Sequence, residues 1–343
     1  MHKSDKRAFF VLLSFLLVLS GCQAKQSAGE TTRTEFVLGT VCALRIDKPN
    51  DAAMDEAFER LAQLEALLTV NKEGSQIDAV NAAAGKNPVK VGPEAMTIIK
   101  RGLHYAELSN GGFDPSVGPL VKLWGIGSDH ARLPSKAEID KAKALINYKD
   151  IVLDEAASTV YLKRPGMALD LGSATKGYAA DEVRAILVRH GVKSGIIDLG
   201  GNILVIGKKD KRTPWHVGLQ DPDAERGNYI GIASLDDCTM VTSGVYERYF
   251  IENGVRYHHI LSPFTGYPVQ NGLTSVTIIT KKSFDADGVT TMLFILGPEK
   301  GMELAQKLGI DVIMLDDQKR IFMTPGASAY FKITDSRYKL VQQ

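Results

Sequence analysis

Residues 196–207 (IIDLGGNILVIG) show the pattern that decides the fold, two short apolar runs separated by a pair of glycines. Such runs around a tight turn are typical of neighbouring antiparallel strands. Further strand-like segments follow: WHVGLQD (215–221), YIGIAS (229–234), CTMVTSG (238–244), YERYFI (246–251), YHHILS (257–262) and TSVTIIT (274–280). A run of adjacent strands favours an α+β fold with mainly antiparallel sheets over a doubly wound parallel sheet.

Other patterns flank this strand-rich part. A strand is expected over residues 36–47. Helices are expected where apolar residues recur at helical spacing. They cover residues 51–68, residues 93 to about 110, a segment from the turn at 170–177 to about residue 190, a segment from about residue 285, and residues 298–308. No linker interrupts residues 36–343, so we expect them to form one compact unit with room for two lobes.

The amino terminus has the plan of a targeting segment. A short basic run precedes the apolar residues 8–20, which are too few to span a bilayer as a helix. The sequence Leu19-Ser20-Gly21-Cys22 is similar to a bacterial lipobox, although an ordinary signal with a chance cysteine has the same plan. We therefore expect residues 1–21 to be removed, Cys22 to be acylated, and polar residues 22–35 to act as a flexible tether. The protein would then be anchored by lipid at the outer face of the cell membrane.

Composition excludes several classes of protein. With 44% hydrophobic and 24% charged residues, the 343-residue chain is neither disordered nor a polytopic membrane protein. Lys and Arg number 41 against 40 Asp and Glu, so no strong positive field exists and no nucleic-acid partner is expected. After Cys22, only Cys42 and Cys238 remain, which predicts buried thiols rather than a disulfide framework or a zinc site. P-loop, Rossmann, G-x-S-x-G and H-E-x-x-H motifs are absent from the sequence.

Two motifs could hold an anionic ligand and a metal ion. Asp287 and Thr291 are four residues apart at the start of an expected helix, so their oxygens share one face. Such hard oxygen ligands suit Mg²⁺, although an Asp in a first turn also stabilises a helix without any metal. Residues 170–177 (DLGSATKG) form an expected strand-to-helix turn in which Lys176 and free N–H groups could bind phosphate. A generic turn with a surface lysine is the alternative.

Two adjacent histidines end an expected strand. His258 and His259 should point to opposite faces, so at most one lines a site. Histidine suits proton transfer near neutral pH, but a lone histidine is more often structural.

Together the motifs resemble the ApbE family, whose members attach FMN covalently to proteins using FAD and Mg²⁺. The matching segments occur in family order over nearly all of the expected mature chain: 36–40, 111–114 with 119–125, 170–179, 198–202, 242–244, 259–266 and 286–291. The departures are Leu38 for the usual methionine, Thr175 for a common alanine, and Ser262 for the usual aspartate, whose contacts are therefore in doubt.

The resemblance implies roles for single residues. Asp287 and Thr291 match metal-binding side chains, and Ser173 matches a position that ligates metal through its backbone. His259 matches the histidine assigned to catalysis. Positions that contact FAD are matched by Leu38, Gly112, Phe113, Asp114, Asp170, Lys176 and Ile260. Asn71 matches a variable position at which a small polar residue goes with FAD turnover.

The implied activity is Mg²⁺-dependent transfer of FMN from FAD to a Thr or Ser hydroxyl of an extracytoplasmic acceptor flavoprotein, with release of AMP. With water as the nucleophile, the same site would act as an FAD pyrophosphatase. A non-catalytic FAD-binding lipoprotein is the third alternative. A carboxylate such as Asp285 could replace His259 as the base.

Overall fold

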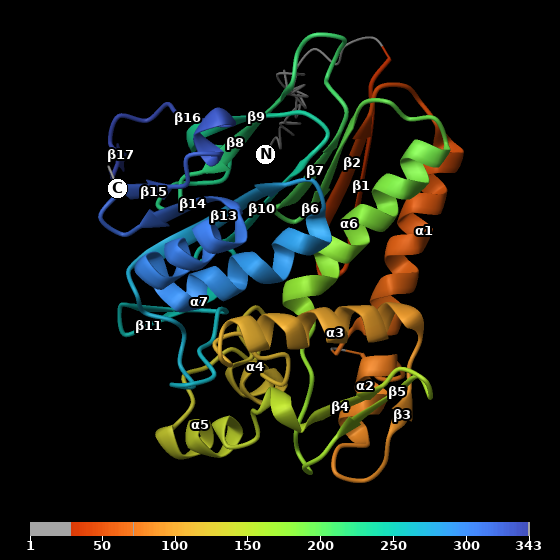
Figure 1. Cartoon of the computed structure of the whole chain (residues 1–343), viewed down its shortest axis with the longest axis vertical. Coiled ribbons are helices and arrows are strands. Elements are labelled where there is room, and N and C mark those ends of the chain that lie inside the picture. Colours follow the sequence, from red (N-terminus) through yellow and green to blue (C-terminus); the bar gives the residue numbers. More distant parts are fainter. Residues whose placement is uncertain (1–28, 71, 342–343) are drawn as a thin grey trace, which may run out of the picture.

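A computed structural model describes residues 29–70 and 72–341. Its centre is a nine-stranded sheet in the order β1-β2-β6-β7-β10-β13-β14-β15-β17 (Figure 1). All neighbouring pairs are antiparallel except β15 and β17. The strands are β1 (Thr31–Val37), β2 (Thr40–Ile46), β6 (Gly195–Leu199), β7 (Asn202–Ile206), β10 (Thr239–Gly244), β13 (Leu273–Thr280), β14 (Asp311–Asp316), β15 (Arg320–Met323) and β17 (Lys339–Leu340). The predicted α+β fold is confirmed.

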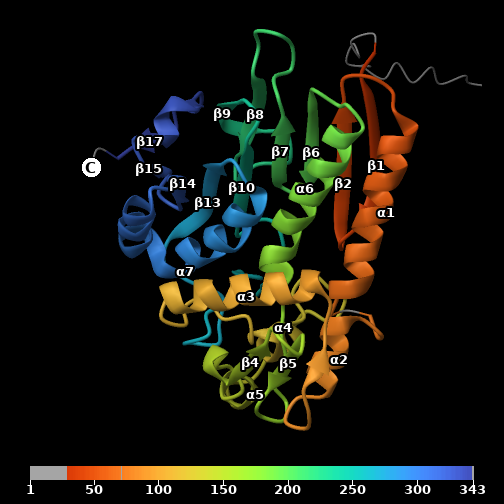
Figure 2. The same ribbon diagram turned by 45° about the vertical axis from the view of Figure 1, so that its right-hand side comes forward.

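Helices cover one face of this sheet. α1 (Asp51–Leu68), α6 (Gly172–Arg189) and α7 (Ser283–Leu308) lie side by side on it, as Figures 1 and 2 both show. Their apolar residues and those of the strands form two buried clusters. α6 and α7 cross closely at their amino-terminal ends, and this crossing places the candidate site.

A second, three-stranded sheet packs on the opposite face. It consists of β8 (Trp215–Gln220), β9 (Tyr229–Leu235) and β16 (Phe331–Ile333), the last preceded by the short helix η2 (Ala327–Ala329). A separate apolar cluster fills the space between the two sheets.

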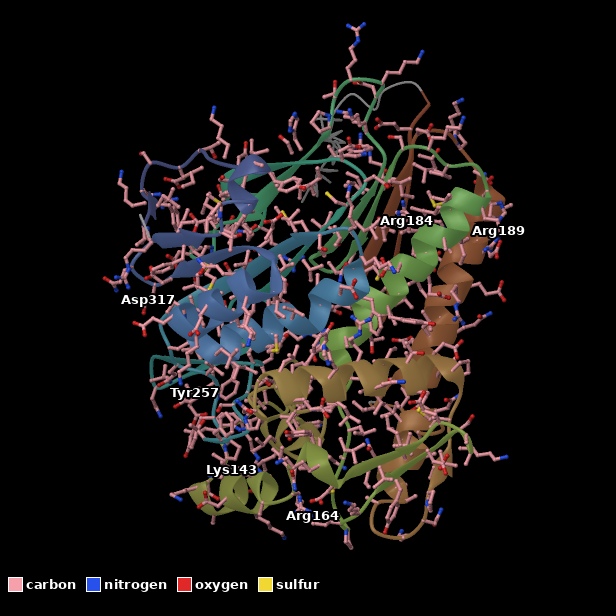
Figure 3. All side chains as sticks on the ribbon, viewed as in Figure 1. Lys143, Arg164, Arg184, Arg189, Tyr257 and Asp317 are labelled. Carbon is pink, nitrogen blue, oxygen red and sulfur yellow. The ribbon has the colours of Figure 1, made fainter. Side chains whose placement is uncertain are left out.

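The lower part of the molecule in Figure 1 is mainly helical. α3 (Pro93–Leu108) runs beneath the ends of α6 and α7 in both ribbon views. The other elements here are α2 (Gln76–Ala82), α4 (Gly118–Trp124), α5 (Lys136–Lys143), η1 (Tyr148–Asp150) and the small sheet of β3 (Val89–Lys90), β4 (Ile151–Asp154) and β5 (Thr159–Leu162). A hairpin of β11 (Tyr249–Glu252) and β12 (Val255–His258) packs on α4 through Trp124, whose ring lies 5.6 Å from that of Tyr257. Figure 3 labels Tyr257 beside this lower part.

Two expectations about the first strand were wrong. β1 begins at Thr31, so residues 31–35 belong to the sheet and not to the tether. The sequence of residues 31–35 is polar although it forms an edge strand. Every second side chain of this strand faces solvent, and those between them are only half-buried. The single strand expected over residues 36–47 is a hairpin, with Leu38 and Gly39 at its turn at φ values of 56° and 66°. Residues 1–21 and Cys22 lie outside the described residues.

α7 contains the break expected between two helices. Gly297 has φ 82° and ψ 177°, and Pro298 follows it. Within residues 29–70 and 72–341, no helix combines the length and the apolar composition needed to cross a membrane.

Candidate active site

The crossing of α6 and α7 depends on Gly177. A Cβ atom at this position would lie 2.4 Å from the carbonyl oxygen of Ser283 and 2.8 Å from the Cβ of Asp287. Neither neighbour can yield easily, because one is backbone and the other is anchored to it. Glycine therefore allows the first turns of the two helices to approach.

Asp287 is buried at this crossing. Its Oδ2 accepts a hydrogen bond of 2.8 Å from the Gly177 N–H, which in a regular helix would donate to the Ser173 carbonyl. Burial raises the pKa of Asp287, while Lys176, the N–H groups of Lys176 and Gly177, and Asn202 oppose that rise. A bound cation would also oppose this rise in pKa, because its positive charge favours the ionised carboxylate.

Polar side chains of β7 and β10 form hydrogen bonds with residues near the start of α7, beside Asp287. Thr290 Oγ1 donates to the Asp287 carbonyl at 2.7 Å. The Thr291 hydroxyl lies 3.2 Å from the hydroxyl of Ser243 on β10. Asn202, at the start of β7, is fully buried and accepts from the Ser283 hydroxyl.

These groups fit Mg²⁺ in chemical type. The Asp287 carboxylate, the Thr291 hydroxyl and the Ser173 carbonyl are hard oxygen donors, and Mg²⁺ usually takes few protein ligands and keeps positions for water and phosphate. Within the described part of the chain, no group of three or more His, Cys, Asp and Glu side chains could hold a metal ion. A metal site with a single carboxylate would therefore need ligand phosphates to complete it.

His259 directly follows β12. Its N–H and its Nδ1 both lie near the Arg248 carbonyl, at 3.1 and 3.3 Å. Burial, Arg248 and Lys176 together lower the pKa of His259 to about 3, against the hydrogen bond to the Arg248 carbonyl, so the imidazole is neutral at pH 7. Because a carbonyl only accepts, Nδ1 carries the hydrogen and Nε2 has the free lone pair.

His258 turns the other way. Its Nε2 lies 2.9 Å from the Val269 carbonyl, and its ring contacts that of Phe294 in the core. The two histidines thus take opposite faces, and the core position of His258 makes it structural.

Arg248 connects His259 to other predicted site residues, and sequence reasoning missed it. Its Nη2 donates to the Gly39 carbonyl at 3.3 Å, beside Leu38. Burial raises the pKa of Asp170, and the charge of Arg248 opposes this rise. No local signal marks an arginine just before a strand as part of a site, because Gly39 and Asp170 are both more than 70 residues away from it in sequence.

The remaining predicted FAD contacts have varied surroundings. Phe113 and Ile260 are buried in one apolar cluster, where Phe113 packs edge-on against Tyr105, and Gly112 is buried before Phe113. Both carboxylate oxygens of Asp114 are occupied: Ser116 N–H and hydroxyl donate to one, and Tyr148 N–H donates to the other. Asp114 therefore holds the loop that presents Phe113. Asn71 lies outside the described residues.

Asp285 lies away from the candidate site formed by Asp287 and its neighbours. Its carboxylate forms an ion pair with Arg101 of α3, and Arg101 also lies over the Phe284 ring. Two surface hollows, of about 320 and 650 Å³, border this outer side of α7 and α3, and neither is lined by Asp287 or His259.

Comparison with known proteins identifies relatives over nearly the whole chain. The ApbE family profile matches residues 38–314. The chain is 36% identical to the FAD:protein FMN transferase of Treponema pallidum (strain Nichols) over 349 residues, covering 96% of each protein. It is 38% identical to that of Klebsiella pneumoniae (strain 342) over 306 residues, covering 89% of this chain and 95% of the relative.

Solved structures agree. The ApbE protein of Thermotoga maritima superposes with a TM-score of 0.82 at 30% identity, over 88% of this chain and 99% of that one. The flavin transferase ApbE of Vibrio cholerae gives 0.76 at 25% identity, over 90% and 98%, and a histidine-to-glycine mutant of that protein is similar too. The sequence profile, the relatives and the fold agree that this chain belongs to the ApbE family.

Proposed function

We propose that the protein transfers the FMN part of FAD to a Thr or Ser hydroxyl of an acceptor flavoprotein, in a reaction that needs Mg²⁺ and releases AMP. Flavin transfer follows from the family. The finer statement is supported by one observation above all: the buried Asp287 carboxylate binds the N–H of Gly177, the residue after Lys176, where α6 and α7 cross. Thr291 lies one turn further along α7, and the charge of Lys176 acts on both Asp287 and His259.

Asp287, Thr291 and the Ser173 carbonyl would hold Mg²⁺, which when bound neutralises charge on the FAD pyrophosphate. Lys176 directly precedes Gly177, whose N–H binds Asp287, so it would bring a positive charge to this end of the site. The same charge opposes the rise in the pKa of Asp287 and lowers that of His259. This charge would stabilise the phosphate of the departing AMP.

His259 would accept the proton of the acceptor hydroxyl at Nε2. The hydroxyl oxygen forms a bond to the FMN phosphorus, the bond from that phosphorus to the bridging oxygen breaks, and AMP leaves with the electron pair. In the free protein the pKa of His259 is about 3, which makes the imidazole a weak base. An anionic pyrophosphate beside Lys176 and Arg248 would raise that pKa towards the working pH.

Mass spectrometry tests the proposal directly. The protein is incubated with FAD, Mg²⁺ and a candidate acceptor flavoprotein. An acceptor that gains the mass of FMN minus water supports transfer. Free FMN with an unmodified acceptor supports a pyrophosphatase, and unchanged FAD supports a non-catalytic binding protein.

We also propose that the protein is held at the outer face of the cell membrane by a lipid on Cys22. The lipobox-like sequence before Cys22 supports this location. Cys22→Ser should release an active protein from the membrane fraction, because the acyl chains supply the anchor. A Cys22→Ser protein that stays in the membrane fraction at high salt would contradict the lipid anchor.

A further inference from the structure

α7, the helix that carries Asp287, has no side-chain cap of its own at its first turn. The residue at the N-cap position is Lys282, which has extended backbone angles and makes no side-chain hydrogen bond to the helix. The first N–H groups of a helix need partners, and an Asp, Asn, Ser or Thr at the N-cap usually supplies them.

Asp181 of α6 supplies these partners from a different helix. Its Oδ1 accepts from the Ser283 N–H and its Oδ2 from the Phe284 N–H, each at 3.0 Å. A carboxylate at this end also interacts favourably with the helix dipole of α7. Asp181 therefore acts as the N-cap of α7, although it lies about 100 residues earlier in the chain.

The hydrogen bonds between the two helices are reciprocal. Gly177 lies one turn before Asp181 on α6, and its N–H donates to the Asp287 carboxylate at 2.8 Å. A backbone donor of α6 thus binds a carboxylate of α7, while a carboxylate of α6 binds two backbone donors of α7. This exchange fixes the rotation and the height of one helix against the other.

We propose that Asp181 is a positioning residue for the transfer reaction: by capping α7 from α6, it sets the direction of the Asp287 carboxylate and the Thr291 hydroxyl towards the metal and the FAD phosphates. This inference rests on the proposed function, because it takes Asp287 and Thr291 as the metal ligands. Both carboxylate oxygens of Asp181 accept N–H groups of α7, so Asp181 would act through the helix and not by contact with metal or substrate.

The test compares three variants and measures metal binding apart from activity. Asp181→Ala removes the cap. Asp181→Asn keeps one acceptor oxygen and nearly the same volume, so it serves if the alanine variant folds poorly. Asp181→Ala with Lys282→Asp places a capping carboxylate at the α7 N-cap itself, where the extended backbone suits it. Arg184→Ala is the matched control, because Arg184 lies on α6 and pairs with Asp237, outside the α6–α7 crossing (Figure 3).

Metal affinity is measured with Mn²⁺ by electron paramagnetic resonance and with Mg²⁺ by calorimetry, and kcat is measured against Mg²⁺ concentration. Asp181→Ala should weaken metal binding roughly 3- to 30-fold, the range that loss of an N-cap implies, and raise the Mg²⁺ concentration for half-maximal rate by a similar factor. Lys282→Asp in the Asp181→Ala background should recover most of the affinity. Arg184→Ala should leave the affinity unchanged.

Two outcomes would overturn the inference. One is an Asp181→Ala or Asp181→Asn protein whose melting temperature is lower than that of the wild type but whose metal affinity is unchanged. The other is a double variant that recovers its melting temperature without recovering metal affinity. If the wild-type protein transfers FMN but binds neither Mn²⁺ nor Mg²⁺, the metal part of the proposed function is wrong. The inference about Asp181 is then wrong as well.

Discussion

The candidate site lies between two regions that differ in exposure: the α6–α7 crossing is buried, and the β11–β12 hairpin is exposed. At the crossing, Asp287 is buried, and Gly177 leaves no room for one additional methyl group. At the hairpin, which leads into His259, the side chains of Tyr249 and Ile251 are 42% and 63% exposed. The first region suits a small ligand held in one fixed geometry. The second is open to a macromolecule, as the proposed reaction on a protein hydroxyl would require.

The largest effect should come from Asp287→Ala. Loss of the only carboxylate of the proposed metal site leaves two neutral oxygen donors, so transfer and FAD hydrolysis with Mg²⁺ should both fall below detection. FAD binding measured by fluorescence should persist, because the flavin contacts lie elsewhere. Asp285→Ala is the control, since this carboxylate pairs with Arg101. Equal losses of activity in Asp287→Ala and Asp285→Ala would contradict the assignment of Asp287 as the metal-binding carboxylate.

Gly177→Ala should damage both the stability and the chemistry of the crossing. The added Cβ meets backbone at 2.4 Å, so the helices must separate, at a cost of about 1–3 kcal/mol. Metal affinity should fall with it. Ala185→Gly, on the exposed side of the same helix, should cost about 0.5–1 kcal/mol through helix propensity alone and leave metal affinity unchanged. Denaturant melts and calorimetry measure both quantities.

His259→Ala should lower the transfer rate about 10²- to 10⁴-fold, the usual contribution of a general base. FAD affinity should change little. His258→Ala should instead lower stability, because its ring packs on Phe294 in the core. A large loss of FAD binding in His259→Ala, with the rate of the bound complex intact, would make this histidine a binding residue.

The pH dependence sharpens the assignment of His259. Since burial and Arg248 hold its pKa at about 3 in the free protein, the imidazole stays neutral from pH 7 down to about pH 5. The acidic limb of kcat/KM, which reports the free enzyme, should therefore lie below about pH 5. The limb of kcat should lie at higher pH, because bound phosphates raise this pKa. If the acidic limbs of kcat/KM and of kcat both lay near pH 6.5, the protein would not shift the pKa of His259.

The smallest effect should come from the exposed region. Ile251→Ser should raise the KM for the acceptor protein a few-fold while FAD hydrolysis stays unchanged, because water needs no docking surface. Val152→Ser, at another exposed apolar side chain on β4, is the control. An effect of Ile251→Ser on hydrolysis equal to that on transfer would show that Ile251 acts through FAD.

Local pattern predicted much of the fold and one half of the site. The spacing of Asp287 and Thr291 placed both on one helix face, and strand alternation separated His258 from His259. Asp181, Asn202 and Arg248 were missed, because each acts on residues distant in sequence through ordinary polar contacts. The tether was predicted too long, because an edge strand with one polar face resembles a polar linker.

The burial of Asp287 also has a thermodynamic consequence. A carboxylate held away from water opposes folding until a cation shares its charge, so the proposed metal binding and the packing of α6 on α7 would be linked equilibria. The melting temperature should therefore rise with the logarithm of Mg²⁺ concentration above the dissociation constant. Removal of the metal should speed amide hydrogen exchange first where α6 and α7 begin, while the strands behind them keep their protection.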